Sequence, residues 1–253
     1  MSAGDKTASF VLNLTITQIT SNTHTSMPIS PLQYSRPFVS VIIPNYNHAL
    51  YLRERINSVL NQTYDAFEVI LLDDASTDTS LEVIDDYRHH EKVTQVIINQ
   101  ENTGNTFKQW QRGLSLARGE YIWIAESDDV ASPTFLEEVL EKMLIHDAVL
   151  GFSGSQIIDS NGHRVNKNYD NFGLFNYKDC YDGKAFARRF LVFGNRLYNA
   201  SMIVFRKAEA EQVSEHFTQF NAAGDWLFWF ELCQKGKVVC VRKKLNQSRL
   251  SAH

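Results

Sequence analysis

Tyr121-Ile122-Trp123-Ile124-Ala125-Glu126-Ser127-Asp128-Asp129 is a short apolar run that ends in three carboxylates within four residues. The run from 121 to 125 is too short for a helix and rich in β-forming side chains, so it predicts a buried strand. The carboxylates then lie at the C-terminal end of that strand, where open α/β sheets bind ligands. Clustered carboxylates repel one another unless a cation or hydrogen-bond donors neutralise them. A hard divalent ion such as Mg²⁺, which takes only one or two protein carboxylates, fits this cluster. The alternative is a solvated acidic turn before a helix that begins near Ser132-Pro133.

Composition narrows the class of protein. A chain of 253 residues with 43% hydrophobic and 21% charged residues can form one large globular domain with appendages. The net charge of -4 and the lack of a basic tract disfavour nucleic-acid binding. Cys180, Cys233 and Cys240 lack metal-ligand spacing and suit a reducing compartment, so the cytoplasm is the expected location. No apolar stretch approaches the roughly 20 residues of a membrane span, although contact with the inner face of a membrane stays open.

The composition of the chain changes near residue 37. Residues 1–36 are rich in Ser, Thr, Asn and Gln and predict an extended arm or linker, with one added strand over 10–19. Apolar runs then alternate with helical periodicity. The expected strands lie at 39–43, 67–72, 93–98, 121–125, 148–152, 155–158, 201–205 and 237–241. The expected helices cover 49–61, 133–144, 183–193 and 225–234, with a capping box of Thr79 and Glu82 before another and Gly119 ending a further one.

This alternation predicts a parallel sheet with helices on both faces. Three loops at strand ends, 44–47, 73–78 and 126–129, should therefore meet at one edge. Tyr46 offers a flat ring for stacking a base, and Asp74 can accept a hydrogen bond from a ring N–H, which would select uracil or thymine. The alternative for each loop is ordinary turn chemistry of Asn and Asp.

Two quoted stretches carry a resemblance to a known family. VSVIIPNYNHALYLRERINSVLNQTYDAFEVILLDDASTD followed by NTGNTFKQWQRGLSLARGEYIWIAESDD resembles the inverting family-2 glycosyltransferases, over about residues 38 to 253. The resemblance implies an α/β GT-A fold, with a mostly parallel, Rossmann-like central sheet flanked by helices on both faces. It implies a smaller acceptor-side region beside this sheet, with a nucleotide-sugar-binding half over 37–130 and an acceptor-side half over 131–253.

The resemblance also assigns the donor site. Pro44 and Tyr46 map to the loop after the family's first strand, and Asp74 maps to the acid that binds the nucleobase. The family's DxD-type motif, which holds the ribose and a divalent ion, Mn²⁺ or Mg²⁺, maps to the acids at 126–129. Its first position here is Glu126 rather than the commoner Asp. Asp128 is the first choice as metal ligand and also belongs to the predicted nucleotide site, and Asp129 is the next choice as metal ligand.

Two further motifs lie downstream. Ala223-Gly224-Asp225-Trp226 resembles the family's acceptor-side motif, in which an Asp at the start of a helix is the general base, so Asp225 is the predicted catalytic residue. A partly desolvated carboxylate can have the raised pKa that this role needs, whereas helix N-capping is the alternative. Arg249-Leu250-Ser251-Ala252-His253 resembles the Arg-x-x-x-His ending of such domains, whose His or Arg reaches the diphosphate and the metal, so His253 is a third predicted metal ligand. Asn199-Ala200-Ser201-Met202 fits a segment near the acceptor or the sugar.

The predicted function is transfer of a sugar from a nucleotide-diphosphate donor, preferably a UDP- or dTDP-sugar, to an acceptor hydroxyl. The resemblance points to synthesis of a bacterial surface polysaccharide or lipopolysaccharide, with a glycan or lipid-linked glycan as acceptor, and to a domain of a longer multidomain chain. One alternative is a catalytically silent nucleotide- or glycan-binding module of a larger enzyme. Another is a nucleotidyltransferase, although the loop 44–47 lacks the Gly-rich, basic phosphate loop expected there.

Overall fold

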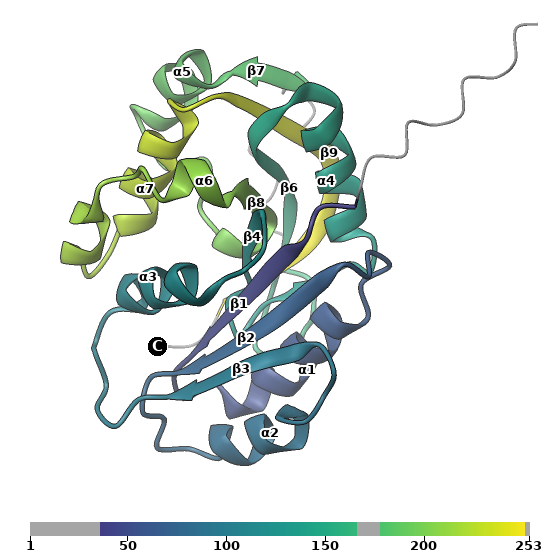
Figure 1. Cartoon of the computed structure of the whole chain (residues 1–253), viewed down its shortest axis with the longest axis vertical. Helices are drawn as coiled ribbons and strands as arrows, with labels where there is room; N and C mark the ends of the chain where they lie inside the picture. Colours follow the sequence, from purple (N-terminus) through teal and green to yellow (C-terminus); the bar gives the residue numbers. More distant parts are fainter. Residues whose placement is uncertain (1–35, 166–177, 251–253) are drawn as a thin grey trace, which may run out of the picture. The chain divides into compact units, whose positions relative to one another are not determined.

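A computed structural model describes residues 36–165 and 178–250. The predicted strand over 10–19, nearly all of the predicted arm and His253 lie outside the described residues, and the predicted domain boundaries stay predictions. The described chain folds as an α/β protein built on one sheet (Figure 1). No helix in these two ranges is long and apolar enough to cross a membrane.

The sheet of the described residues has nine strands. They are β1 Val39–Asn45, β2 Phe67–Asp73, β3 Val93–Ile98, β4 Tyr121–Ile124, β5 Val130–Ala131, β6 Ala148–Ile158, β7 Cys180–Asp182, β8 Ile203–Arg206 and β9 Lys237–Arg249. The order is β3-β2-β1-β4-β8-β6-β9-β5, and β7 pairs with β9. The strands from β3 to β4 are parallel, as predicted, whereas β8 runs antiparallel to both of its neighbours. The carboxyl ends of β1, β2 and β4 therefore share one edge.

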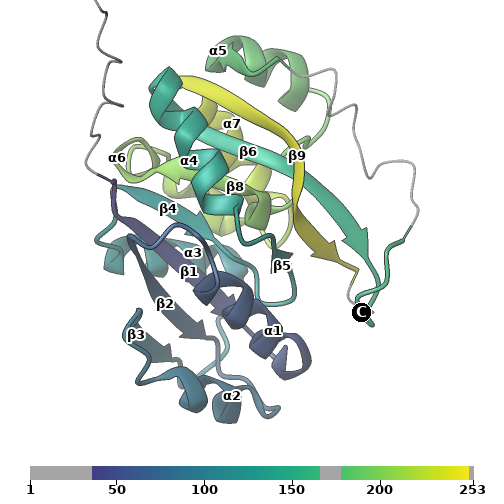
Figure 2. The same cartoon turned by 90° about the vertical axis from the view of Figure 1, so that its right-hand side faces the viewer.

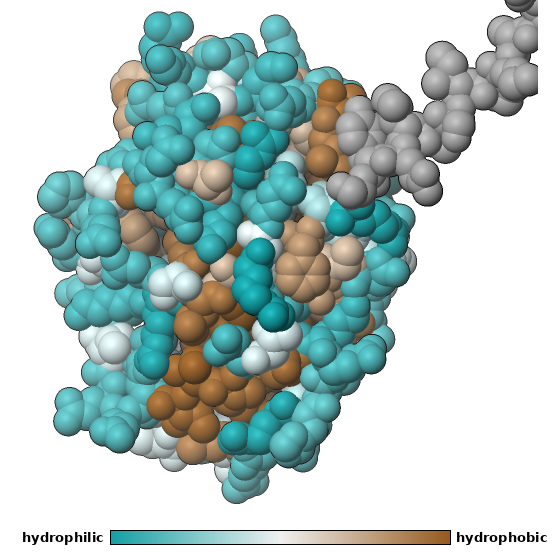
Figure 3. Space-filling model, viewed as in Figure 1, coloured by the Kyte–Doolittle hydropathy of each residue, from teal (hydrophilic) through white to brown (hydrophobic). Residues whose placement is uncertain are grey.

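Helices cover both faces of this sheet, which confirms the predicted fold class. They are α1 Ala49–Leu60, α2 Ser80–Tyr87, α3 Thr106–Leu116, α4 Phe135–His146, α5 Gly183–Phe186, α6 Lys207–Ala210 and α7 Gly224–Cys233, with a π-helix η2 at Ala187–Leu191 and 3-10 turns η3 at Ala200–Met202 and η4 at Glu215–Gln219. Apolar residues of α1, α2 and α4 pack on one face, and those of α3, α5, η2 and α7 pack on the other (Figures 1 and 2). Because successive strand residues point to opposite faces, β1 contributes Val41 and Ile43 to the first core and Ile42 to the second. Figure 3 shows an apolar surface over the edge strand β3, where Ile98 is exposed.

Strand ends differ from the sequence predictions for identifiable reasons. Pro44 was expected to stop β1, yet the strand continues to Asn45. At Pro44 the strand pairs only with Leu72 of β2, because β4 has already ended at its side, so the missing N–H breaks no ladder. The strands predicted at 148–152 and 155–158 are one strand, β6, whose pairing with β9 is irregular near Ser153–Ser155.

The strand β9 is much longer than the sequence predicted. Its apolar run ends at Val241, where the prediction stopped, but the strand continues to Arg249 because β6 and β5 offer partners there. Tertiary pairing overrides the polar composition of the extension. The consequence is functional, since this extension carries Arg249 to the edge that holds the acidic loop.

Three local predictions about helices differ in detail from the structure. Thr79 makes no capping hydrogen bond with its side chain, and Asp78 instead accepts from the backbone N–H of Ser80 and Ala49. Gly119 does not end a helix: α3 ends at Leu116, and a β-carbon at Gly119 would lie 2.4 Å from the nitrogen of Ser40, so glycine permits a close backbone approach. The helix predicted over 183–193 is divided into α5 and η2.

Candidate active site

A cavity of about 620 Å³ lies at the edge where the parallel strands end. It is lined by residues of all three predicted loops, by His48, by the segment 102–109 and by three single residues later in the chain. The lining is Pro44, Asn45, Tyr46, His48, Asp74, Asn102, Gly104, Asn105, Thr106, Gln109, Glu126, Ser127, Asp128, Asp129, Asn199, Asn221 and Arg249. The structure thus brings together every described residue predicted for the nucleotide and the metal, while their roles stay predictions.

The acid before Asp74 fixes the loops after β1 and β2. Asp73 is buried and accepts hydrogen bonds from Asn45 Nδ2 at 2.8 Å, from Ser76 N at 2.9 Å and from Ser76 Oγ at 2.7 Å. The Ser76 hydroxyl in turn accepts from the backbone N–H of Asn47. Tyr46, on the loop held in this way, has an exposed ring at the cavity wall, as stacking on a base requires.

Asp74 lies in the cavity wall but is already heavily bonded. Its carboxylate accepts from Asn99 Nδ2 at 2.6 Å, from Gln109 Nε2 at 2.9 Å, and from both the backbone N–H and the hydroxyl of Thr103. These donors come from the turn after β3 and from α3. The carboxylate therefore holds one wall of the cavity in place, and a nucleobase N–H would have to share an oxygen that these donors already use.

The acids at 126–129 have three different environments. Glu126 accepts from Trp110 Nε1 at 2.9 Å, and burial, followed by the charge of Asp128, raises its pKa to about 8. Asp129 accepts from Asn199 Nδ2 at 2.7 Å and from the backbone N–H of Arg249 at 2.9 Å. Burial and the charge of Asp128 raise its pKa as well, although the Arg55 guanidinium opposes this. The neighbouring cations thus do not fully neutralise the carboxylates of this loop.

Asp128 is the acid best able to hold a cation. It is half-buried in the cavity wall, and within 36–165 and 178–250 its carboxylate has no hydrogen-bond donor. Those residues contain no group of three or more His, Cys, Asp or Glu arranged around a common ion position. The donor set therefore fits an ion such as Mg²⁺ or Mn²⁺ that takes one or two carboxylates and completes its shell with water and phosphate oxygens.

Arg55 is the buried countercharge near these acids. Its side chain is fully buried, stacks over the Trp123 ring at 5.0 Å and has no hydrogen-bond partner for its three nitrogens among the described residues. Burial lowers its pKa to about 10, and the charges of Asp129, Glu126 and Asp128 act against that lowering. The sequence prediction did not single out this residue, because an arginine on an amphipathic helix usually faces solvent.

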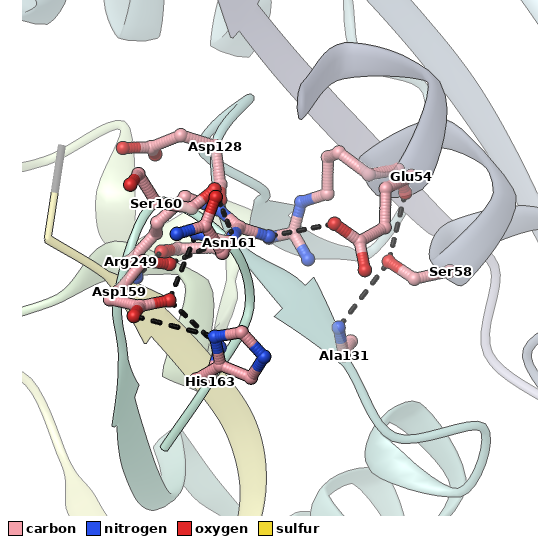
Figure 4. Close-up of polar contacts among 11 residues, drawn as sticks. Glu54, Ser58, Asp128, Ala131, Asp159, Ser160, Asn161, His163 and Arg249 are labelled. Carbon is pink, nitrogen blue, oxygen red and sulfur yellow. Dashed lines mark hydrogen bonds and ion pairs between the residues drawn. The ribbon is translucent and has the colours of Figure 1, made fainter. Parts of the chain in front are cut away.

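Arg249 ties the acidic loop to its surroundings (Figure 4). Its guanidinium donates to the carbonyl of Asp128 at 2.8 Å, to the carbonyls of Asp159 at 3.0 Å and Ser160 at 3.3 Å, and to the carboxylate of Glu54 at 2.7 Å. The side chain is only 2% exposed. Because four oxygens already use its donors, Arg249 holds the loop in place, and the contact with the diphosphate that the sequence resemblance indicated stays a prediction. His253, the other half of that motif, lies outside the described residues.

The sequence prediction missed His48 and did not give the contacts of the segment 199–202. His48 lines the cavity, and its Nδ1 lies 2.8 Å from the hydroxyl of Ser127. Its position just after β1, at the ligand-binding edge, was the available signal. In the predicted segment 199–202, Asn199 lines the cavity, and the Ser201 hydroxyl accepts from the backbone N–H of Glu126. The segment 199–202 thus holds the acidic loop 126–129 in place.

Asp225, the predicted catalytic residue, lies at the first turn of α7. Asn195 Nδ2 donates to its carboxylate at 2.8 Å, and burial raises its pKa. Ala223, two residues earlier, has a left-handed backbone with φ of 62°, an uncommon conformation for a residue other than glycine. Asn221 lines the donor cavity, and Asn105 Nδ2 donates to the carbonyl of Phe220, so this segment connects the cavity to α7. Asp225 itself is not part of the cavity lining formed by the described residues.

Comparison with known proteins identifies relatives of this chain. The profile of "Glycosyl transferase family 2" matches residues 40–205. Among curated proteins, an uncharacterised glycosyltransferase of Haemophilus influenzae is 27% identical over 85% of this chain and 66% of its own length. Glycosyltransferase GlyG of Streptococcus pneumoniae is 38% identical over 44% of this chain and 36% of its own length. TuaG of Bacillus subtilis, whose name refers to teichuronic acid biosynthesis, is 31% identical over 52% of each chain. The chain thus spans between about a third and two thirds of these relatives.

Solved structures show the same fold. The S. aureus TarS fragment 1–349 in complex with UDP superposes with a TM-score of 0.65 at 22% identity, covering 85% of this chain and 61% of that one. The complex of the same fragment with UDP-GlcNAc gives a TM-score of 0.66 at 21% identity, over 85% and 59% of the two chains. At this level of identity the likeness concerns the fold.

Proposed function

Because this chain belongs to glycosyl transferase family 2, we propose that it is a metal-dependent, inverting transferase that moves a sugar from a UDP- or dTDP-sugar to an acceptor hydroxyl. The observation that carries the proposal is the single cavity in which the ends of β1, β2 and β4 present a stacking ring, an acidic loop and a nucleobase-side carboxylate. UDP and UDP-GlcNAc in the structural neighbours, and the polysaccharide context of TuaG, support it. The acceptor we propose is a glycan or lipid-linked glycan of a surface polysaccharide or lipopolysaccharide.

The donor side contributes binding and position. The exposed ring of Tyr46 stacks on the nucleobase, and Asp74, with the turn that it holds, forms the wall that the base meets. Asp128 would hold Mn²⁺ or Mg²⁺, and Asp129 is the second candidate ligand. When bound, the ion offsets the negative charge that grows on the leaving diphosphate. The bonds to Asp129 from Asn199 and Arg249 keep the loop in one geometry, so little reorganisation is needed during the reaction.

The acceptor side contributes the proton acceptor. An acceptor hydroxyl must lose its proton as it attacks the anomeric carbon, and a carboxylate with a raised pKa accepts it more readily. Asp225 has this property because of burial, and Asn195 orients one of its oxygens. Attack from the face opposite the diphosphate would give inversion at the anomeric carbon.

The decisive experiment is a screen of nucleotide sugars for hydrolysis and transfer with Mn²⁺ or Mg²⁺, combined with calorimetric titration of UDP, dTDP, GDP and ADP. We expect UDP or dTDP to bind only with the metal present, and Asp74→Ala to weaken nucleotide binding more than metal binding. Equal affinity for GDP and ADP would contradict the pyrimidine assignment. Nucleotide binding without any transfer would favour a silent binding module, and incorporation of the nucleotide into product would favour a nucleotidyltransferase.

A further inference from the structure

An apolar groove of about 450 Å³ lies on the acceptor side. Its walls come from the end of η2, from the segment before α7 and from α7 itself. The lining consists of Leu191, Val192, Phe220, Ala223, Trp226, Leu227 and Phe230. No charged side chain belongs to it, so water gains little by entering and an apolar partner gains much. None of the proposed donor contacts uses this groove.

Large apolar side chains are exposed to solvent at and beside the groove. Phe193, directly after the groove residue Val192, is 93% exposed, and Val192 and Phe220 are 48% and 46% exposed. Single exposed apolar residues are common, but a contiguous set around a groove marks a surface that a partner covers.

Cations border this apolar set. Lys184, Arg188 and Arg189 are exposed on the helical stretch formed by α5 and η2. Arg188 and Arg189 lie in the last turn of η2, which ends at Leu191, directly before Val192 and Phe193. The segment 182–196 has four Lys and Arg residues and one acid, in a chain whose net charge is -4. The charge of this segment therefore favours an anionic partner.

We propose that this groove and its basic rim form the docking surface for an anionic lipid bilayer. Aromatic and aliphatic side chains inserted at the headgroup boundary, with flanking Lys and Arg on anionic headgroups, are the recognised physical basis of peripheral membrane binding. The groove shares α7 with Asp225, so a docked molecule would hold the candidate base at the bilayer surface, where a lipid-linked acceptor presents its sugar. That last step rests on the proposed function, whereas the docking itself does not.

The four tryptophans allow a direct measurement. Trp110, Trp123 and Trp229 are at most 2% exposed, whereas Trp226 is half-buried and lines the groove. Brominated phospholipid in phosphatidylcholine vesicles containing phosphatidylglycerol should therefore quench the fluorescence of Trp226, and Trp226→Phe should abolish the quenching. Vesicles of phosphatidylcholine alone should bind weakly, and added salt should weaken binding to the anionic vesicles.

Variants locate the surface. Phe193→Ala should weaken binding to the anionic vesicles roughly tenfold through lost apolar burial. The double variant Arg188→Gln, Arg189→Gln should weaken it roughly 30-fold, because each cation near an anionic surface contributes about a factor of five. Ile98→Ala on the edge strand β3, and Arg88→Gln with Lys92→Gln, which remove two cations outside the segment 182–196, are the matched controls and should bind as the parent does.

Absence of binding to the anionic vesicles, or binding that neither variant weakens, would overturn the proposal. Self-association that Phe193→Ala abolishes, without vesicle binding, would instead assign the groove to a second copy of the chain. The vesicle measurements use neither the nucleotide-sugar donor nor the acceptor. If the chain does not bind vesicles, the glycosyltransferase proposal is therefore unaffected. If the chain binds vesicles but transfers no sugar, the docking proposal holds and the glycosyltransferase proposal fails.

Discussion

The two regions that we propose as the donor side and the acceptor side are built on different principles. On the donor side, Asp73, Asp74 and Asp129 are each held by two or more hydrogen bonds from neighbouring loops. On the acceptor side, Asp225 has one side-chain partner among the described residues, Asn195, and lies next to an apolar groove with an exposed rim. The donor pocket is thus organised before any ligand arrives. The acceptor side is a surface that a large, partly apolar partner would complete.

The strongest test of this contrast is Asp225→Asn. If Asp225 is the base, the substitution keeps its size and removes proton acceptance, so transfer should fall about 10²- to 10⁴-fold while donor affinity hardly changes. If Asp225 only caps α7, Asn is an equally good cap and little should change. The measurement is the transfer rate at saturating donor, with a melting curve to exclude unfolding. Near-normal transfer by the folded variant would remove Asp225 from the mechanism.

The second test compares two acids of the same loop. Asp128→Ala should weaken Mn²⁺ binding at least tenfold and lower turnover by about 10²-fold, because this carboxylate is the one without a hydrogen-bond donor in the described chain. Glu126→Asp restores the commoner family residue and should retain more activity. Metal titration followed by calorimetry, with turnover measured alongside, distinguishes them. An unchanged metal response in Asp128→Ala would transfer the ligand role to Asp129.

The third test concerns the support of the acidic loop. Arg249→Lys keeps the charge but cannot donate to all four oxygens that Arg249 reaches, so the carbonyls of Asp128 and Asp159 lose hydrogen bonds (Figure 4). We expect unfolding to require about 2–4 kcal/mol less free energy. Metal binding should also weaken, since the loop is released.

Glu54→Gln is the matched control for Arg249→Lys. It removes only the ion pair, and the Glu54 side chain is 55% exposed, so it should cost less than about 1 kcal/mol. Urea unfolding and metal titration of both variants provide the comparison. Equal and small effects of the two substitutions would show that the carbonyl contacts contribute little.

What the sequence could predict follows the same division. The strands β1 to β4 and the meeting of their loops were predictable because buried apolar runs and parallel order determine where strand ends lie. The second half of β9 was not predictable, since its polar residues extend only because β6 and β5 pair with them. For the same reason the tie from Arg249 to the acidic loop was not visible: its partners are backbone carbonyls distant in the sequence. The buried position of Arg55 and the groove on α7 likewise depend on packing rather than on any local pattern.

The smallest expected effect concerns pH, and it probes the charge left on the donor side. The pKa of Glu126 is raised from 4.5 to about 8 in the folded protein, chiefly by burial, and Asp129 is shifted in the same direction. A carboxyl whose pKa is raised by folding stabilises the folded state fully below its ordinary pKa and loses that contribution as pH rises through the folded value. The metal-free protein should therefore lose roughly 1–3 kcal/mol of stability between about pH 5 and pH 8. Glu126→Gln cannot ionise, so its urea midpoint should change less over this range, and Mn²⁺ should reduce the loss in the parent by neutralising the charge. If Glu126→Gln and the parent depend on pH identically, Glu126 is already ionised at neutral pH, and the donor side is neutralised better than its bonds indicate.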